Sequence, residues 1–206
     1  MLLRIHPQDP QPRAIQQVVD CLRKGGVIIY PTDTVYGIGC DINQRKAVER
    51  ICQIRRIDPD KAQFSFICSD LSHISEYCAS LDTPVFKMMK RALPGPYTFI
   101  LNATSRVPKI FQSRKRTVGI RVPDHVLPVQ IVRELGNPIM TSSVHDDDDM
   151  IEYTTDPELI HEKYGHLVDI VIDSGYGGFE ASTVVDCSGS EPFLVRQGKG
   201  DVDLLF

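Results

Sequence analysis

The stretch Tyr30–Gly39, "YPTDTVYGIG", follows the apolar run "GGVIIY" and interrupts it abruptly. Residues 27–30 are all apolar, as in a buried strand, and Pro31 lacks the N–H that would continue a backbone ladder. Hydroxyl groups, a carboxylate and two glycines follow at once. In open α/β sheets, ligands bind beyond the carboxyl ends of strands. The stretch therefore predicts a ligand-binding loop, with glycines that allow close backbone approach, or a hydroxyl-rich turn that satisfies its own backbone. The pattern alone slightly favours the turn.

Helical and extended patterns alternate through the first two thirds of the chain, and extended patterns cluster at its end. Helical spacing predicts helices over residues 12–24, 45–56, 70–80, 83–93 (with Thr83 as the cap), 125–136 and 156–165. Apolar runs predict strands over residues 27–30, 64–68, 97–103, 117–122, 138–144, 167–173, 182–187 and 192–196. This order predicts one α/β domain over residues 1–206, with an open, twisted, mixed sheet and helices on both faces.

The composition excludes several classes of protein. A net charge of −4 and a pI near 5.8 provide no general attraction to nucleic acid, so RNA binding would need a local basic patch. Six cysteines without a Cys-x-x-Cys pair predict a reduced, cytoplasmic protein and not a disulfide scaffold or zinc site. We expect no signal peptide and no membrane contact, because no apolar run approaches the ~20 residues that span a bilayer.

Two basic clusters could bind phosphate. In "QIRRIDPDK", Arg55, Arg56 and Lys61 stand beside aspartates, and arginine forks suit phosphate oxygens. The alternative is a solvated helix end with local ion pairs, which is the commoner outcome for mixed charges. The run "SRKRT" at residues 113–117 could contact an RNA backbone, although three charges in a loop are more often simply solvated.

Hydroxyl groups gather again in "TSSVHDDDD" at residues 141–149, where Ser142 and Ser143 could bind phosphate. The aspartates could hold Mg²⁺ through water, although an acidic, mobile loop is the interpretation that we favour. A Ser–His–Asp hydrolase is excluded, because the Gly-x-Ser-x-Gly elbow is missing. The glycine-rich "DSGYGGFEAST" lacks the lysine and the helix start of a P-loop, and it predicts a flexible loop.

Taken together, these segments resemble the YrdC-like family of threonylcarbamoyl-adenylate synthases over about residues 12–200. Six motifs follow the order and spacing of that family: "PTDTVYGIG", "PGPYTFIL", "TVGIRVP", "PIMTSS", "ASTVVD" and "LVRQGKG". The segments "AVERICQIRR", "MMKRALPGPYTFIL" and "GKGDV" are more similar to the YciO branch. The resemblance implies the YrdC-like fold, an open twisted α/β sheet with a deep, positively lined cavity.

The resemblance also implies an activity. ATP, L-threonine and bicarbonate would condense to threonylcarbamoyl-adenylate and pyrophosphate, with Mg²⁺, for the modification of adenosine 37 in tRNA. Such a reaction needs fixed cations and accurate positioning and no covalent nucleophile. The family motifs assign catalytic roles to Thr32 and Arg55 and substrate-binding roles to Thr32, Tyr36 and Thr98. They assign nucleotide-binding roles to Arg55, Arg56, Ser143, Ser182, Thr183 and Arg196, and they assign no metal ligand to the protein.

Two positions depart from the family pattern. The synthases carry Lys-x-Arg at the end of the second helix, whereas an ungapped alignment here gives Arg55 and Ile57, and a shifted one gives Gln53 and Arg55. The asparagine of the family's Ser-x-Asn motif is His145 in this chain. These departures leave an alternative open, in which the same fold serves as a non-catalytic nucleotide- or double-stranded-RNA-binding protein.

Overall fold

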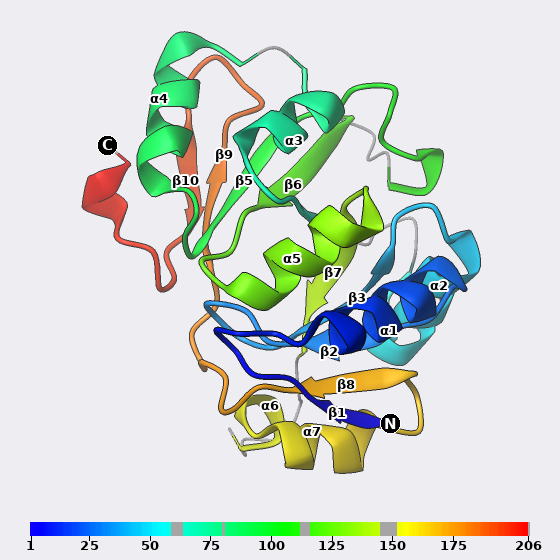
Figure 1. Ribbon diagram of the computed structural model, residues 1–206. Coiled ribbons are helices and arrows are strands. Elements are labelled where there is room, and N and C mark those ends of the chain that lie inside the picture. Colours follow the sequence, from blue (N-terminus) through cyan, green and yellow to red (C-terminus); the bar gives the residue numbers. More distant parts are fainter. Residues whose placement is uncertain (59–63, 80, 112–115, 145–151, 206) are drawn as a thin grey trace.

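The computed structural model describes residues 1–58, 64–79, 81–111, 116–144 and 152–205 (Figure 1). Within these residues, ten strands form one mixed sheet in the order β1-β8-β2-β3-β7-β4-β6-β5-β9-β10. The strands are β1 (Leu2–Arg4), β2 (Ile28–Tyr30), β3 (Gly37–Asp41), β4 (Ser65–Ile67), β5 (Tyr97–Asn102), β6 (Thr117–Arg121), β7 (Ile139–Ser143), β8 (Ile170–Asp173), β9 (Thr183–Asp186) and β10 (Phe193–Arg196). The predicted open, mixed α/β sheet is confirmed.

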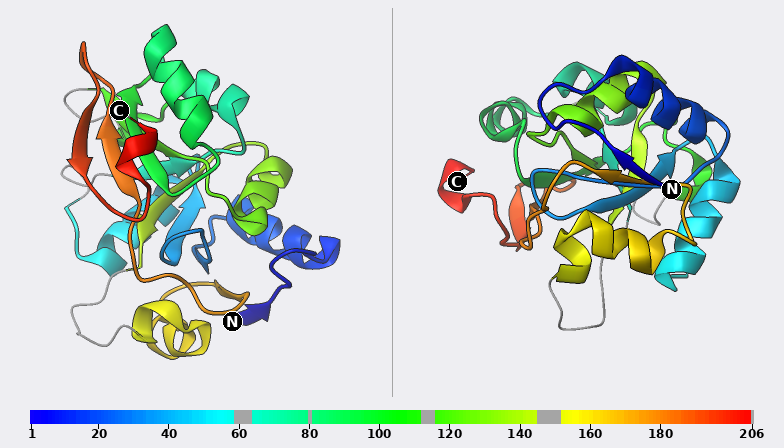
Figure 2. Two further views of the ribbon diagram at one scale, coloured as in Figure 1. Left: turned by 90° about the vertical axis from the view of Figure 1, so that its left-hand side faces the viewer. Right: turned by 60° about the horizontal axis from the view of Figure 1, so that its bottom comes forward.

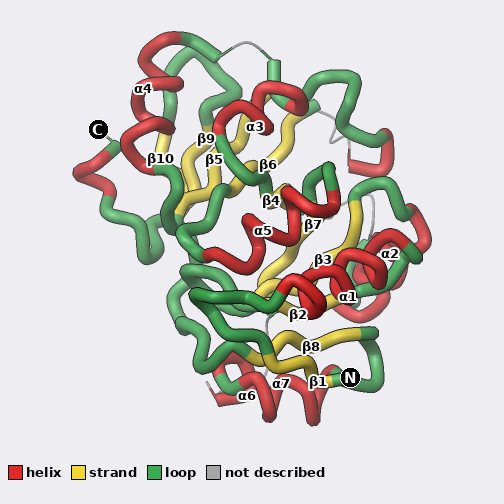
Figure 3. The backbone as a smooth tube through the Cα atoms, in the orientation of Figure 1, coloured by secondary structure: helices red, strands yellow, loops and turns green. Residues whose placement is uncertain are grey.

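The helices connect these strands and lie on both faces of the sheet (Figure 3). They are α1 (Pro12–Arg23), α2 (Arg45–Arg55), α3 (Leu71–Tyr77), α4 (Thr83–Ala92), α5 (Val126–Leu135), α6 (Glu152–Thr155) and α7 (Pro157–Tyr164), with short 3₁₀ turns η1 (Lys109–Phe111) and η2 (Val202–Leu204). The cap of α4 is Asp82, so the prediction that Thr83 caps this helix is wrong by one residue. None of the helices in the described ranges is long and apolar enough to cross a membrane.

Two apolar clusters form the core, one on each face of the sheet. On one face, α1 and α5 cover Ile28, Ile67 and Ile139, which alternate along their strands with residues of the other face. On the opposite face, the second cluster contains Ile38 of β3, Phe66 of β4 and apolar residues of α2, α3, α4 and α7. Figure 2 shows α1 and α5 on one side of the sheet and α2 and α7 on the other.

Sequence patterns did not predict strand β3, nor the short elements β1 and α6. The glycines of β3 are typical of a loop. Gly39 lies directly opposite Ile28 in the antiparallel ladder, and its neighbours leave no room for a side chain. A Cβ atom on Gly39 would lie 2.5 Å from the carbonyl oxygen of Met140 and 3.1 Å from Cε1 of Tyr30. The same ring lies 3.1 Å from the position of a Cβ atom on Gly37. The glycines thus make room for Tyr30 within the sheet, whereas the ligand-binding interpretation of this stretch assigns that room to a ligand.

Candidate functional site

A strip of small side chains crosses the middle of the sheet on the face that α1 and α5 cover. Gly39 pairs with Thr141 of β7, Thr141 pairs with Ser65 of β4, and Ser65 pairs with Gly119 of β6. Directly paired residues project from the same face of a sheet. These positions therefore form one continuous row with little side-chain bulk. The side chain of Tyr30 lies against this row, and its hydroxyl donates to Oγ1 of Thr141 at 2.6 Å.

The loop that follows β2 folds over this face and satisfies its own backbone. Oγ1 of Thr32 donates to the carbonyl of Val35 at 2.7 Å and accepts from the amide of Thr34 at 3.0 Å. Oγ1 of Thr34 also lies 3.0 Å from Oγ1 of Thr32. Because the single hydroxyl proton of Thr32 points to Val35, Thr34 is the donor in this pair. The hydroxyl-rich turn is therefore present, and Thr32 holds its conformation.

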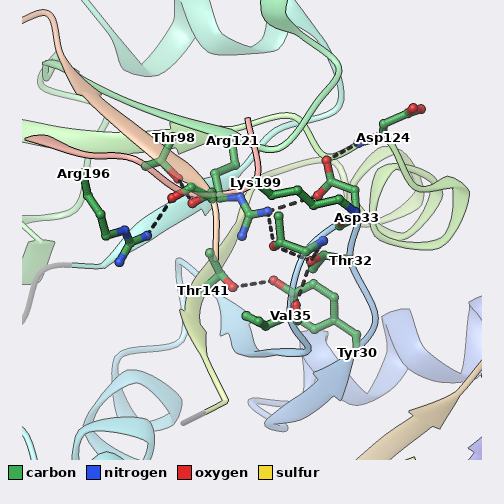
Figure 4. A network of polar contacts seen from close by, with 12 residues as sticks. Tyr30, Thr32, Asp33, Val35, Thr98, Arg121, Asp124, Thr141, Arg196 and Lys199 are labelled. Atoms are coloured by element: carbon green, nitrogen blue, oxygen red, sulfur yellow. Dashed lines mark hydrogen bonds and ion pairs between the residues drawn. The ribbon is translucent and has the colours of Figure 1, made fainter. Parts of the chain in front are cut away.

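Arg121, at the end of β6, begins this hydrogen-bond chain (Figure 4). Its Nη2 donates to Oγ1 of Thr34 at 2.8 Å and to Oδ1 of Asp33 at 3.1 Å, while Oδ2 of Asp33 accepts from the amide of Asp124 at 3.0 Å. The side chain is 7% exposed, so desolvation lowers the pKa of Arg121, and the charge of Asp33 opposes that effect. Within the described ranges, its buried Nε has no hydrogen-bond partner. A buried guanidinium with an unused donor is suited to bind a carboxylate or phosphate oxygen.

Three of the predicted site residues meet next to Arg121. Oγ1 of Thr98 lies 2.8 Å from Oγ of Ser182, and the carbonyl of Ser182 accepts from Nη2 of Arg196 at 2.9 Å. Thr98 stands opposite Arg121, because the neighbouring pair in the antiparallel β5–β6 ladder is Phe99 and Ile120. The positive charge of Arg196 also contributes to the lowered pKa of Arg121. We call Thr98, Arg121, Ser182 and Arg196 the cationic cluster.

Two predicted site residues point into neighbouring loops instead. The hydroxyl of Tyr36 donates to the carbonyl of Gly175 at 2.7 Å, and desolvation raises the pKa of this buried tyrosine. Its ring leaves no space for a side chain at Gly177, where a Cβ atom would lie 2.6 Å away. Thr183 is fully buried and bonds the segment after β10. Tyr36 and Thr183 therefore position loops, and the loop at residues 174–181 is held at several points.

Ser143 and the two arginines of α2 lie at another part of the sheet. Ser143 ends β7 opposite Gly37. Both β3 and β4 run antiparallel to β7, so α2 between them returns the chain to the end where β7 finishes. Arg55 ends α2 there, and the exposed Arg56 follows in a left-handed conformation. Among the described contacts, none joins Arg55 or Arg56 to the cationic cluster.

Several predicted features fall outside the described residues. They include Lys61, Arg114, Lys115, His145 and the aspartates that follow His145. In the described ranges, no group of three or more His, Cys, Asp or Glu side chains could hold a metal ion. Both carboxylate oxygens of Asp33 already accept hydrogen bonds. Mg²⁺ therefore stays a prediction, in which the phosphates of the nucleotide would be its main ligands.

A cavity of about 610 Å³ lies beside the cationic cluster, between the start of α3 and the start of α5. Leu93, Val122, Val126 and Arg133 line it, together with Asp124, whose amide bonds Asp33. Arg121 and Ser182 do not line this cavity. The cationic cluster is the better candidate site, because it combines buried charge, hydroxyl groups and an unused donor.

Sequence patterns did not identify Arg121 or Lys199 as members of the site. Nζ of Lys199 lies 2.5 Å from the carbonyl oxygen of Asp33. The signals for Arg121 were a charged residue at the buried end of the alternating strand "TVGIRVP" and the place of that segment among the family motifs. Lys199 lies in the motif "LVRQGKG", but the motif assigned a role only to Arg196, and the position of Lys199 depends on how the chain folds back after β10.

Comparison with known proteins identifies the fold and its relatives. A family model described as telomere recombination, whose name joins Sua5, YciO and YrdC, matches residues 20–198. Escherichia coli YciO, an uncharacterized protein, is 42% identical over 203 residues, which cover 96% of this chain and 95% of YciO. The crystal structure of E. coli YciO matches with a TM-score of 0.92 at 40% identity and covers 100% of this chain and 99% of that chain.

Synthases are more distant relatives. A threonylcarbamoyl-AMP synthase of Vibrio vulnificus is 28% identical over 186 residues, which cover 89% of this chain and 98% of the synthase. The structure of P. abyssi Sua5 complexed with L-threonine matches with a TM-score of 0.86 at 23% identity and covers 96% of this chain and 57% of that chain. The last likeness shows the fold alone. Together with the YciO structure, it confirms the predicted YrdC-like fold.

Proposed function

Because this chain belongs to the Sua5/YciO/YrdC family, we propose that it is a nucleotidyltransferase of the threonylcarbamoyl-AMP synthase type. Its substrates are ATP, L-threonine and bicarbonate, and its product serves the modification of adenosine 37 in tRNA. Support comes from the 28% identical synthase of Vibrio vulnificus and from the bound L-threonine in P. abyssi Sua5. The observation that carries the proposal is the buried Arg121, which stands opposite Thr98, lies near Arg196 and has an Nε without a hydrogen-bond partner in the described part of the chain.

The residues of the cationic cluster suit the two acidic substrates. The planar guanidinium of Arg121 matches the carboxylate of an amino acid, and Asp33 and Thr34 fix its orientation. Arg196 is exposed at the end of β10 and can reach a nucleotide, while its bond to the Ser182 carbonyl positions it. Figure 4 shows Thr98 between the two arginines, and its hydroxyl lies 2.8 Å from that of Ser182.

The reaction that we propose proceeds without a protein nucleophile. The amine of threonine adds to the carbon of CO₂ derived from bicarbonate and loses a proton, which gives a carbamate. A carbamate oxygen then attacks the α-phosphorus of ATP, the bond to the β-phosphate oxygen breaks, and pyrophosphate leaves. Arginine side chains that lie near the reacting oxygens stabilise the charge that develops during this step. Mg²⁺, when bound to the phosphates, would neutralise further charge there.

The test is the release of pyrophosphate by the purified protein. We expect release only when ATP, L-threonine and bicarbonate are all present, and we expect Arg121→Lys to weaken the dependence on threonine. Lysine keeps the charge but cannot form the two parallel bonds of a guanidinium. Arg91→Lys, at the end of α4 near η2, is the matched control. Release that does not depend on threonine would contradict the proposal.

A second candidate is a non-catalytic protein that binds a nucleotide or double-stranded RNA with the same cluster. The end of α2 favours it, because the Lys-x-Arg of the synthases is incomplete there in either alignment, as Arg55 and Ile57 or as Gln53 and Arg55. Binding of ATP without pyrophosphate release, at protein concentrations above the dissociation constant, would support this second candidate.

A further inference from the structure

Lys199 brings a third cation to the cationic cluster, from the segment that follows β10. Its Nζ donates to the carbonyl oxygen of Asp33 at 2.5 Å, and the side chain is drawn beside Arg121 in Figure 4. An ammonium has three donors, so two remain for a ligand. In the described part of the chain, no carboxylate lies within ion-pair distance of Lys199 or Arg196. Both cations therefore donate to neutral carbonyl groups, and no carboxylate of the described residues neutralises the charge that they can offer to a ligand.

The backbone on both sides of Lys199 is fixed by direct contacts. Oγ1 of the buried Thr183 accepts from the amide of Gly198 at 3.0 Å and donates to the carbonyl of Gly200 at 2.7 Å. The amide of Lys199 itself donates to the carbonyl of Ala181 at 2.9 Å. The hydroxyl of Thr183 therefore closes a turn around Lys199. This role explains why that hydroxyl points away from the cationic cluster.

The two glycines of this turn allow the close packing that the turn needs. A Cβ atom on Gly198 would lie 2.2 Å from the carbonyl oxygen of Ala181, and one on Gly200 would lie 2.4 Å from Cε1 of Tyr97. The hydroxyl of Tyr97 also donates to the carbonyl of Asp201 at 3.0 Å. Side chains of two strands, Tyr97 of β5 and Thr183 of β9, therefore fix the backbone from which Lys199 projects.

We propose that Lys199 is a phosphate-binding residue of this site and holds the β- or γ-phosphate of the nucleotide beside Arg196. This inference rests on the proposed function in one respect, namely that the site takes a nucleoside triphosphate. The planar guanidinium of Arg121 is best suited to a planar carboxylate. The ammonium of Lys199, in contrast, binds phosphate as a compact point charge. Lys199 thus supplies, from the end of the chain, the kind of cation that α2 lacks at Arg55.

The test compares Lys199→Met with Lys199→Arg and with the matched control Lys46→Met. Lys46 is exposed at the start of α2, shortly after β3 ends at Asp41. Calorimetry at one fixed ionic strength measures the binding of ATP, pyrophosphate, AMP and L-threonine, and thermal unfolding without ligand checks the fold of each variant.

We expect Lys199→Met to weaken ATP and pyrophosphate binding about fivefold to twentyfold, as for a partly exposed charge-assisted contact. AMP and L-threonine binding should change less than about twofold, because they lack the phosphates that Lys199 holds. Lys199→Arg should recover part of the loss, and Lys46→Met should match the wild type. The assignment would be overturned by an unchanged ATP affinity in Lys199→Met, or by an equal loss of affinity for AMP. It would also be overturned if the wild type bound neither ATP nor pyrophosphate. Binding that depends on Lys199, without synthesis of an adenylate, would support Lys199 and contradict the proposed function.

Discussion

Arg121 donates from Nη2 to Oδ1 of Asp33 at 3.1 Å, and this ion pair ties the end of β6 to the loop after β2. Both side chains are almost fully buried, with 7% and 8% of their surface exposed. Arg121→Met would leave the Asp33 carboxylate buried without its cation. We expect the free energy of unfolding to fall by about 3–5 kcal/mol, as measured by urea denaturation.

A matched control comes from an exposed ion pair. Arg45→Met removes a contact with Glu49 in which both side chains are exposed, so we expect little change in stability. The double variant Arg121→Met with Asp33→Asn should regain part of the loss, because no unpaired buried charge remains. A loss below about 1 kcal/mol for Arg121→Met alone would contradict a structural role for this pair.

Gly39→Ala tests the close packing of β3 against its neighbours. The new Cβ atom would lie 2.5 Å from the backbone oxygen of Met140, which cannot move away as a side chain could. Overpacking of this kind typically costs about 1–3 kcal/mol, and a backbone contact places the expected loss at the upper end. Gly189→Ala is the control, because no atom lies within 4 Å of its Cβ position. Equal unfolding midpoints for the two variants would show that β3 is not packed as described.

Sequence patterns predicted the layers of the fold well, because apolar periodicity reports burial directly. They failed at β3, where Gly37 and Gly39 carry no apolar side chain and the ring of Tyr30 fills the space above them. They placed Thr98, Ser182 and Arg196 together through family motifs, and the structure brings these residues into contact.

The directions of side chains could not be predicted in the same way. Thr183 follows Ser182 immediately, so in a strand the two must face opposite sides, and only Ser182 faces the cluster. Arg121 and Lys199 belong to the site through contacts with Asp33 across 88 and 166 positions of the chain. No local pattern reports contacts between residues that are so far apart in sequence.

The stability of the protein should fall as the pH drops below about 6.5, partly because of His125. Burial lowers the pKa of this histidine, against the weaker influence of Asp33 and Asp124, and Nδ1 caps α5 by accepting from the amide of Leu127. The unfolded chain therefore binds the proton more readily, so stability is lost as the pH falls from the unfolded pKa through the folded one.

His125→Asn tests this pH dependence. Asparagine can keep the cap of α5 but does not titrate. We therefore expect the unfolding midpoint of the variant to fall less steeply with pH than that of the wild type. The measurement covers about pH 8 to 5, a range that brackets the pKa of an ordinary histidine. An identical slope in His125→Asn and the wild type would exclude His125 as a source.

Arg196→Ala should weaken nucleotide binding and leave the fold intact. The side chain is exposed and bonds only the carbonyl of Ser182 among the described contacts, so its loss removes little internal structure. A charge-assisted contact with a phosphate contributes about 1.5–3 kcal/mol, which calorimetry with ATP would detect. Lys90→Ala, on the exposed side of α4, serves as the control. An unchanged affinity for ATP in Arg196→Ala would remove this residue from the site.

In the function that we propose, the cationic cluster joins an amino-acid carbamate to adenylate. The most direct measurement supplies ¹³C-bicarbonate with ATP and L-threonine to the purified protein and follows the product by mass spectrometry. We predict a threonylcarbamoyl-adenylate that carries one ¹³C atom, that requires threonine, and that decreases strongly in Arg121→Lys and Arg196→Ala. The absence of any labelled adenylate, in a protein that binds ATP by calorimetry, would contradict the account.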